Sequence, residues 1–192
     1  ATDAYTRYLK EDIVREQLLL PYFNLATPPL SDNLARAILP GRQGVWDTKE
    51  VLLSFRFDAA NRLVFGSVGA LRNTGLSVHR EWAKRAMRKL FPQIGDIHFE
   101  HEWYGHIGMT ADNLPRFHRL DDGVYTFCGY NGRGIAPGTV FGRTLAALLV
   151  GEIDESALPL PVVSPAPIAG RGLRSAFYEA GAQLVHLTEA RV

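Results

Sequence analysis

The chain has 192 residues, of which 46% are hydrophobic and 21% charged, with 21 Lys and Arg against 20 Asp and Glu. This composition is typical of a globular protein and argues against disorder and low-complexity structure. The nearly balanced charge gives no sign of a nucleic-acid-binding surface. The longest apolar run, residues 145–150, is far shorter than the roughly 20 residues that cross a bilayer, and no signal-peptide pattern opens the chain. We therefore expect a cytoplasmic protein that binds neither nucleic acid nor membranes.

The first predicted elements are a strand, a short helix and a hairpin. Residues 13–27 are rich in Leu, Val and aromatic side chains, and a proline among them predicts an edge or a bulge in this strand. Ser31 is a typical capping residue and predicts a helix over residues 32–39. Apolar residues alternate over 51–58, and a turn at 59–62 leads into the apolar run 63–66, which predicts a β-hairpin with one buried face.

A longer amphipathic helix follows. Residues 77–91 carry apolar side chains at every fourth position, with basic residues largely on the other side. The predicted inner face carries Val78, Trp82, Ala86 and Leu90.

Residues 97–104 alternate apolar and polar side chains, the pattern of a half-buried strand. Several of these residues are of types that bind metals, namely His98, Glu100, His101 and Glu102, with His106 nearby. The spacing differs from that of a zinc-protease helix, which places two histidines four positions apart with Glu beside the first. We therefore interpret the polar residues as a solvated face of the strand, with His101 on the opposite, inner side, and expect no metal site.

The last third of the chain predicts a strand, a glycine-rich loop and two helices. Residues 124–128 are apolar enough for a buried strand, and a helix should run from about residue 136 or 138 to residue 150. A proline-rich connection follows. The terminal helix, residues 172–187, is expected to turn Leu173, Phe177 and Leu184 inward.

Several familiar enzyme signatures are absent from the sequence. There is no Gly-x-Ser-x-Gly nucleophile elbow, no Gly-x-Gly-x-x-Gly after a strand and no Walker loop. The single cysteine, Cys128, excludes an intrachain disulfide and a cysteine-based zinc cluster. Because it lies in an apolar run, we expect a core thiol with a raised pKa and no nucleophilic role.

The strongest site signal is the glycine-rich loop between the predicted strand and helix. Glycines allow close approach of a ligand to the backbone, and a helix N-terminus presents free N–H groups and a partial positive charge. The loop therefore predicts a site for an anionic or carbonyl group. The same pattern also serves as a simple connection without a ligand. The loop residues are Gly129, Tyr130, Asn131, Gly132, Arg133, Gly134 and Ile135.

This loop and the segment Phe141-Gly142-Arg143-Thr144-Leu145-Ala146 resemble the C-terminal flavin-binding segment of the D-amino-acid-oxidase-like, FAD-dependent oxidoreductases. Other segments follow in the order that the family shows: residues 26–30, 47–48, 62–66, 103–105, 110–112 and 114–115. The likeness is greatest to the branch that oxidises amines and N-substituted glycines, which includes the glycine- and sarcosine-oxidase-like enzymes. It covers only the second half of the family's chain.

The resemblance implies an α+β fold, in which an antiparallel or mixed sheet with helices on one face forms a substrate domain. The last strand and helix of an FAD-binding domain accompany it. In this interpretation residues 1–8 are the trailing end of the FAD-binding domain and residues 9–110 the substrate-binding sheet. Residues 111–152 return to the FAD-binding domain, and residues 153–192 form the proline-rich connection and the terminal helix.

The resemblance also implies a reaction, the oxidation of the C–N bond of an amine or N-substituted amino acid by hydride transfer to FAD. The loop residues 129–135 would bind the cofactor, with backbone N–H groups of residues 131–135 facing the carbonyl side of the flavin. Arg133 would add a positive charge there, or else is an ordinary loop arginine. Because the dinucleotide-binding half is absent, we expect this chain alone to retain no FAD and to be inactive.

The substrate contacts implied by the resemblance depart from the family pattern at one position. α-Amino-acid oxidases of the family carry a carboxylate-binding arginine three positions before the residue corresponding to Thr110, and here that position is Ile107. The change favours an amine, or a carboxylate held from elsewhere, for which Arg56 is the candidate. Trp103 and Tyr104 are candidate pocket walls. Arg56 is alternatively a surface residue, and the two aromatics are alternatively core residues.

The expected partners are a small amine substrate and the missing N-terminal FAD-binding half, and a second copy of the chain is a further possibility. The alternative to an oxidoreductase is a non-catalytic α+β module that binds a ligand or a partner. In that case the glycine-rich loop only connects its strand to its helix.

Overall fold

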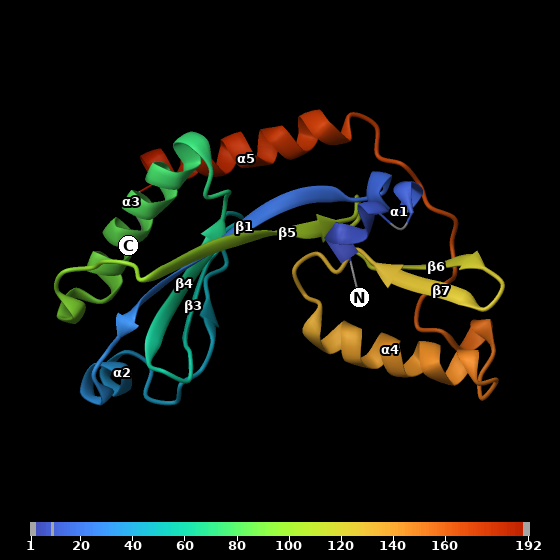
Figure 1. Cartoon of the computed structure of the whole chain (residues 1–192), viewed down its shortest axis with the longest axis horizontal. Helices are drawn as coiled ribbons and strands as arrows, with labels where there is room; N and C mark the ends of the chain where they lie inside the picture. Colours follow the sequence, from blue (N-terminus) through green and yellow to red (C-terminus); the bar gives the residue numbers. More distant parts are fainter. Residues whose placement is uncertain (1–2, 9, 190–192) are drawn as a thin grey trace. The chain divides into compact units, whose positions relative to one another are not determined.

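The computed structural model describes residues 3–8 and 10–189 (Figure 1). Its strands are β1 (Leu18–Pro29), β2 (Val45–Trp46), β3 (Leu53–Phe57), β4 (Arg62–Val68), β5 (His101–Met109), β6 (Arg116–Asp121) and β7 (Val124–Cys128). The α-helices are α1 (Glu11–Arg15), α2 (Asp32–Ile38), α3 (Asn73–Leu90), α4 (Ile135–Leu149) and α5 (Arg171–Thr188). Three short 3-10 helices are η1 (Asp3–Tyr8), η2 (Pro92–Ile94) and η3 (Glu155–Ala157).

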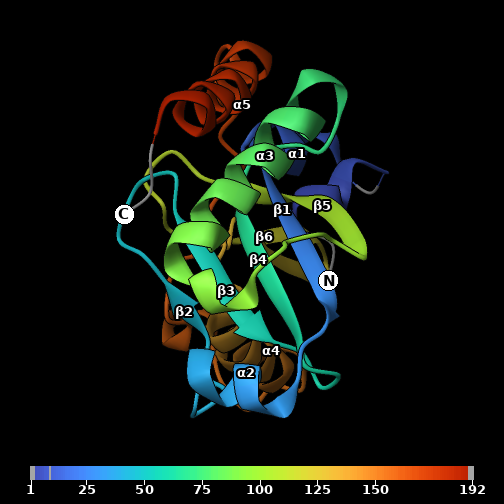
Figure 2. The same ribbon diagram turned by 90° about the vertical axis from the view of Figure 1, so that its left-hand side faces the viewer.

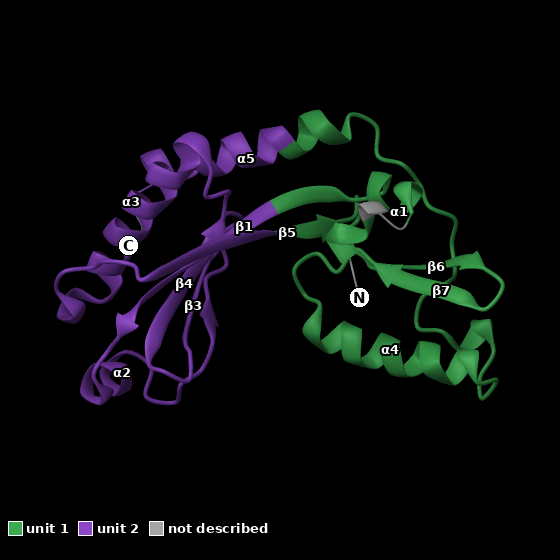
Figure 3. Cartoon of the chain, viewed as in Figure 1, with its two compact units in different colours: residues 1–20, 106–175 green, residues 21–105, 176–192 purple. Residues whose placement is uncertain are grey.

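The chain forms two compact units (Figure 3). Unit 1 consists of residues 1–20 and 106–175, and unit 2 of residues 21–105 and 176–192. Each unit is therefore assembled from two separate stretches of sequence. The predicted division at residues 8, 110 and 152 remains a prediction.

Unit 2 is built on a sheet with the strand order β2-β3-β4-β1-β5, in which the pairs β2–β3, β3–β4 and β4–β1 are antiparallel. The predicted hairpin is confirmed, since Phe55 lies opposite Phe65 in the β3–β4 register. Asp58 accepts hydrogen bonds from the backbone N–H groups of Ala60 and Arg62 and so closes the turn. The fold is α+β, as expected.

Helix α3 covers one face of this sheet (Figure 2). The predicted amphipathic helix is confirmed and begins four residues earlier, at Asn73. Trp82 and Ala86 are buried as predicted, and Phe23 and Phe65 of the sheet pack in the same core. The helix also buries His79, which the apolar periodicity did not indicate.

The terminal helix α5 confirms its predicted bounds but not its predicted orientation. Leu173, Phe177 and Leu184 are exposed instead of inward. Its buried residues are Ala182 and His186. The error has a physical cause: a small side chain and a hydrogen-bonding ring fit the packed surface of unit 2, so the inner face is not the most apolar one.

Two strand predictions are wrong at their starts. Residues 13–15 of the predicted strand belong instead to α1, which is stabilised by the ion pair between Glu11 and Arg15, four positions apart. β5 begins at His101 instead of residue 97. Ile97 is nevertheless buried, because the connection that precedes β5 packs on the core.

The predicted polar face before and within β5 is exposed, but His101 is exposed as well, not inward as expected. Its imidazole lies beside the carboxylate of Glu100, 3.8 Å away. Within the described residues, no three His, Cys, Asp or Glu side chains come together as metal ligands.

Unit 1 contains the antiparallel hairpin of β6 and β7 and the helix α4. Strand β7 has the predicted bounds, as does the Ser31-capped helix α2 of unit 2 to within one residue. β7 is less buried than expected, because only Cys128 of its residues is fully buried. A small core forms around Phe117, Leu145 and Leu158.

Much of the apolar surface of α4 lies open. Ile135 is 92% exposed and Leu149 55% exposed, and Val150 just after the helix is 71% exposed. Large apolar side chains this exposed at both ends of one helix are consistent with a contact to another protein segment.

Among residues 3–8 and 10–189, no helix combines the length and the apolar character needed to cross a membrane.

Candidate functional site

The glycine-rich loop lies in unit 1 between β7 and α4, the arrangement that the sequence predicts. Gly129, Asn131 and Gly132 have φ angles of 73°, 54° and 79°. Glycine reaches this left-handed region without steric cost, and asparagine tolerates it better than most residues. The loop therefore turns sharply at three of four successive residues before Gly134 starts α4 in an ordinary helical conformation.

Asn131 fixes this loop to the end of β5. Its side-chain oxygen accepts a hydrogen bond from the N–H of Thr110 at 2.9 Å, and its amide nitrogen donates to the Thr110 hydroxyl at 3.2 Å. Its own backbone N–H donates to the carbonyl of Gly108 at 3.1 Å. Asn131 therefore holds the loop by both side chain and backbone, a role that its tolerance of positive φ could have suggested.

A carboxylate lies behind the first turn of the loop. Asp3 accepts a hydrogen bond from the N–H of Gly129 at 2.7 Å. Burial raises the pKa of the Tyr130 phenol to about 12, and the negative charge of Asp3 adds to the rise. Tyr130 is thus neutral at physiological pH, with its hydroxyl hydrogen available for donation.

Cys128 directly precedes the loop and behaves as expected. It is 1% exposed, and desolvation, with smaller effects from Glu16 and Asp3, raises the pKa of its thiol to about 12. A thiol with this pKa is protonated at neutral pH and is a poor nucleophile.

Part of the predicted row of N–H donors is free. The N–H groups of Asn131 and Arg133 donate to the carbonyls of Gly108 and Tyr130. The N–H groups of Gly132, Gly134, Ile135 and Ala136 have no partner among the described residues. The first turn of α4 holds no acidic residue, so the positive end of the helix dipole is not neutralised there.

Besides Asp3 and Tyr130, a cation and an apolar group lie at the loop. Arg133 is exposed and forms no ion pair within the described part of the chain. Ile107 of β5 lies beside Gly132, where an added Cβ would be 3.4 Å from the isoleucine Cδ1. The position that the resemblance assigns to an arginine in amino-acid oxidases is thus next to the loop and apolar here.

In unit 2 the candidate substrate residues fall on two faces of the sheet. Leu53, Phe55 and Phe57 of β3 pack toward α3, so Arg56 projects from the opposite face. Tyr104 packs on the same α3-side core, which leaves its neighbour Trp103, 45% exposed, on the face of Arg56. The structure brings Arg56 and Trp103 to one face and Tyr104 to the other.

The face that carries Arg56 also holds polar residues that the sequence analysis did not single out. The Tyr22 hydroxyl and the Ser54 hydroxyl are hydrogen-bonded at 2.7 Å. Gly66 lies between Ser54 and Asn24 in the sheet register, and a Cβ there would meet Asn24 Oδ1 at 2.7 Å. The sequence signal that could have found them is strand alternation: like Arg56, these residues occupy the positions between the core-facing ones.

Tyr22 is perturbed by this setting. Burial raises the pKa of its phenol, the Asp47 carboxylate adds to the rise, and the Ser54 hydrogen bond opposes it. Arg56 is exposed and has no ion pair within the residues that the structure describes. This surface therefore offers one uncompensated cation and several neutral hydrogen-bonding groups.

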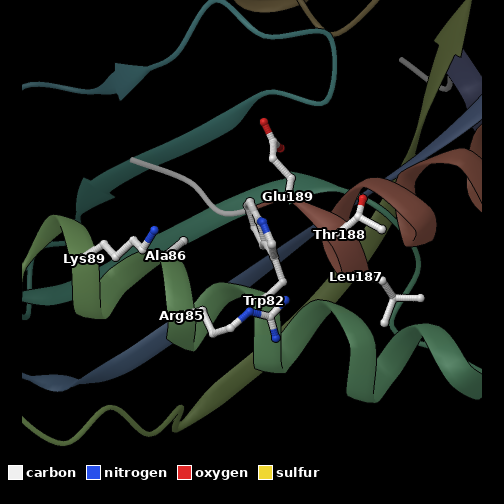
Figure 4. Close-up of a pocket in the computed structure, with 7 residues that line it drawn as sticks. All are labelled: Trp82, Arg85, Ala86, Lys89, Leu187, Thr188 and Glu189. Carbon is white, nitrogen blue, oxygen red and sulfur yellow. The ribbon is translucent and has the colours of Figure 1, made fainter.

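Unit 2 also contains a small pocket at the ends of α3 and α5 (Figure 4). It is lined by Trp82, Arg85, Ala86, Lys89, Leu187, Thr188 and Glu189. Trp82 belongs to the α3-side core, so this pocket lies on the opposite face of the sheet from Arg56.

A strand, a glycine-rich turn and a helix whose first N–H groups are free form a type of site that suits an anionic or carbonyl group. Residues 1–148 match the model of the family described as FAD dependent oxidoreductase, the D-amino-acid-oxidase-like enzymes. This match covers more than half of the chain, and the chain belongs to that family.

Two curated relatives support this assignment. The chain is 29% identical over 187 residues to the probable oxidoreductase OrdL of Haemophilus influenzae, covering 95% of this chain and 42% of the relative. It is 32% identical over 169 residues to the gamma-glutamylputrescine oxidoreductase of Escherichia coli, covering 86% of this chain and 39% of the relative. The chain spans about two fifths of the length of these relatives.

A solved structure shows the same fold. The glycine oxidase from Geobacillus kaustophilus superimposes with a TM-score of 0.53 and 19% sequence identity. The match covers 81% of this chain and 40% of that enzyme.

Proposed function

We propose that this chain is the C-terminal, substrate-domain portion of an FAD-dependent oxidoreductase that oxidises the C–N bond of an amine carrying a carboxylate. The observation that carries the proposal is the set of free N–H groups at Gly132, Gly134, Ile135 and Ala136 in a member of this family. Residues 129–135 are the proposed cofactor contact.

The residues of the loop fit the carbonyl-bearing end of a flavin. Unpaired N–H donors, a helix N-terminus without acidic residues and an exposed Arg133 all favour a group that carries negative charge. The chain has no dinucleotide fingerprint for the adenosine and pyrophosphate end. We propose that the preceding half of the complete protein supplies it, with residues 1–8 and 111–152 completing the same FAD-binding domain.

When bound, FAD supplies the acceptor for the hydride that leaves the carbon next to the amine nitrogen. The free loop N–H groups would donate hydrogen bonds to a flavin oxygen and so stabilise negative charge on the reduced ring. The positive charge of Arg133 would add to this stabilisation. Asn131 and Asp3 hold the loop so that these donors keep their places before substrate arrives, as preorganised electrostatic stabilisation requires.

Residues 9–110 form the proposed substrate domain, and Arg56 is the proposed carboxylate contact. The guanidinium is exposed, unpaired within the described residues and on the same sheet face as Trp103. Ile107 replaces the arginine implied for amino-acid oxidases, so a carboxylate has to be bound elsewhere. An amine that bears a carboxylate away from its reacting nitrogen suits this arrangement, and γ-glutamylputrescine, after which the E. coli relative is named, has that chemistry.

A chimaera tests the proposal. The flavin-binding region that precedes the matched part of the E. coli relative is joined to this chain, and the product is examined for bound FAD. We expect a yellow protein whose flavin absorbance bleaches anaerobically with γ-glutamylputrescine. A folded chimaera that binds FAD but is reduced by no amine would overturn the proposed reaction and favour the non-catalytic binding module.

Two substitutions in the same chimaera separate the proposed roles. Arg133→Ala should slow flavin reduction more than it weakens substrate binding, because its charge matters most as the anion forms, and Arg133→Lys should restore much of the rate. Arg56→Ala should raise the apparent KM for carboxylate-bearing amines and leave neutral amines unchanged. Equal effects of Arg56→Ala on both classes of amine would remove Arg56 from the site.

A further inference from the structure

Helix α5 carries an exposed apolar stripe within unit 2, which consists of Phe177, Ala180, Leu184 and Leu187. Phe177 is 73% exposed, and the two leucines are each 62% exposed. The residues follow one another at intervals of three, four and three positions, so they lie on one side of the helix. We call them the α5 stripe.

The opposite side of α5 fixes the helix to α3 and β4, so the stripe is exposed, with Leu187 at its end also lining the pocket described above. The two rings of His79 and His186 are buried and joined by a 2.7 Å hydrogen bond between their Nδ1 atoms. Arg72 forms an ion pair with Glu179, and Thr74 donates to Gln183 at 3.0 Å.

The charge around the stripe argues for a protein partner over a lipid surface. Between residues 175 and 188 the only Asp, Glu, Lys or Arg is Glu179, and it is paired with Arg72. The two arginines of α5, Arg171 and Arg174, lie in its first turn, and Arg171 donates to the carbonyl of Gln17. Helices that lie on membranes carry Lys and Arg along their polar side. The stripe lacks this feature, and no charge in that range opposes a second apolar helix.

The intervals of three, four and three positions read the same from either end of the helix. The stripe can therefore pair with an antiparallel copy of itself. If two copies of α5 pair antiparallel about a two-fold axis near position 182, Phe177 faces Leu187 of the second copy, and Ala180 faces Leu184 of the second copy. Each large side chain then meets an apolar one, and the small Ala180 lets the helices approach at the centre. Such a self-complementary contact is what a two-fold dimer requires.

We propose that the α5 stripe binds the α5 stripe of a second copy of this chain, antiparallel, to form a homodimer. A standard interface buries about 800 Å² on each partner. A single helix stripe buries less than this. The dimer should therefore be weak and concentration-dependent.

Sedimentation velocity of the 192-residue chain over a range of concentrations tests the proposal. The original chain should show a monomer–dimer equilibrium, and Leu184→Glu should weaken association about tenfold or more through loss of one buried leucine contact. Val150→Glu is the matched control, because it places the same charge at another exposed apolar position, just after α4. A chain that is monomeric throughout, or a dimer lost in Val150→Glu and kept in Leu184→Glu, would overturn the proposal.

Cross-linking tests the antiparallel register independently. Ala180→Cys and Leu184→Cys chains, made separately with different tags and mixed under mild oxidation, should form the mixed disulfide in preference to either symmetric one. The native Cys128 is buried and does not compete. Equal amounts of symmetric and mixed products, or a monomer that instead sediments with phosphatidylglycerol vesicles, would contradict the proposed pairing.

Discussion

At the scale of single residues, Asn131 is the one whose loss should affect the glycine-rich loop most. Its side chain bonds both the N–H and the hydroxyl of Thr110, and its backbone has a positive φ. Asn131→Gly keeps the backbone conformation and removes the side-chain bonds, so it should lower the free energy of unfolding by about 1–2 kcal/mol. Asn131→Ala should cost roughly 1 kcal/mol more because alanine resists positive φ.

Urea unfolding of the three chains measures both differences. Thr139→Ala is a suitable control, because this exposed hydroxyl bonds only a carbonyl within α4. Identical midpoints for the Asn131→Gly chain and the original would show that the side chain does not hold the loop.

Cys128 gives a second prediction at this scale. A pKa of about 12 leaves about one thiol in ten thousand ionised at pH 8. The folded chain should therefore react with a thiol reagent orders of magnitude more slowly than the urea-unfolded chain. Similar labelling rates in the two states would mean that Cys128 is neither buried nor perturbed.

At the scale of elements, the junction of α3 with α5 should be sensitive to pH. The Ser67 hydroxyl donates to the carbonyl of Leu52, so it accepts from His186 Nε2, and His79 Nδ1 donates to His186 Nδ1. A proton added to His79 would then lie on Nε2, which is buried and has no acceptor. Burial accordingly lowers the pKa of His79 to about 4, although the facing Glu179 carboxylate, paired with Arg72, opposes the shift.

The sign follows from this lowered pKa. The unfolded chain takes up a proton at a pKa near 6.5, before the folded chain does, so His79 contributes stability that is complete above pH 6.5 and is lost as pH falls toward 4. The loss should be on the order of 2–3 kcal/mol. Urea midpoints measured from pH 7 to pH 4 should fall, and His79→Asn, which cannot titrate, should flatten the curve. Parallel curves for both chains would contradict the assignment.

The elements also show what the sequence could predict. Three elements have strong sequence signals: hairpin β3–β4, helix α3 and the Ser31-capped helix α2. Their signals are alternating apolar residues, apolar residues four positions apart and a capping side chain, all of which act within a few residues. The inner face of α5 was mispredicted because apolar periodicity marks the most hydrophobic side, whereas its contacts are set by Ala182 and His186 against distant residues. The position of the glycine-rich loop between a strand and a helix followed from the sequence, but its fixation by Asp3 did not, since that contact joins residues 126 positions apart.

At the scale of the whole molecule, the exposed apolar surface of α4 predicts how the chain behaves without its proposed first half. The purified chain should fold, hold no FAD and bind a hydrophobic dye such as ANS at this surface. Ile135→Gln with Leu149→Gln should reduce the dye signal, whereas Leu184→Gln, in the α5 stripe, should affect it less. Tightly bound FAD in the purified chain would refute the proposal that a preceding half supplies the main flavin contacts.

The pairing of Asp3 with Gly129 has a consequence for the order of events during synthesis. The ribosome adds about 5–20 residues per second, so Asp3 waits several seconds for its partner N–H to be made. Residues 21–105 can form their hairpin and helix in that interval. Residues 176–189 are made after all of unit 1, and only then can His186 reach His79 and Ser67. Unit 2 therefore starts to fold before unit 1 is complete and finishes after it, so a released chain that ends at residue 175 should have an ordered glycine-rich loop in unit 1 and an unfinished unit 2.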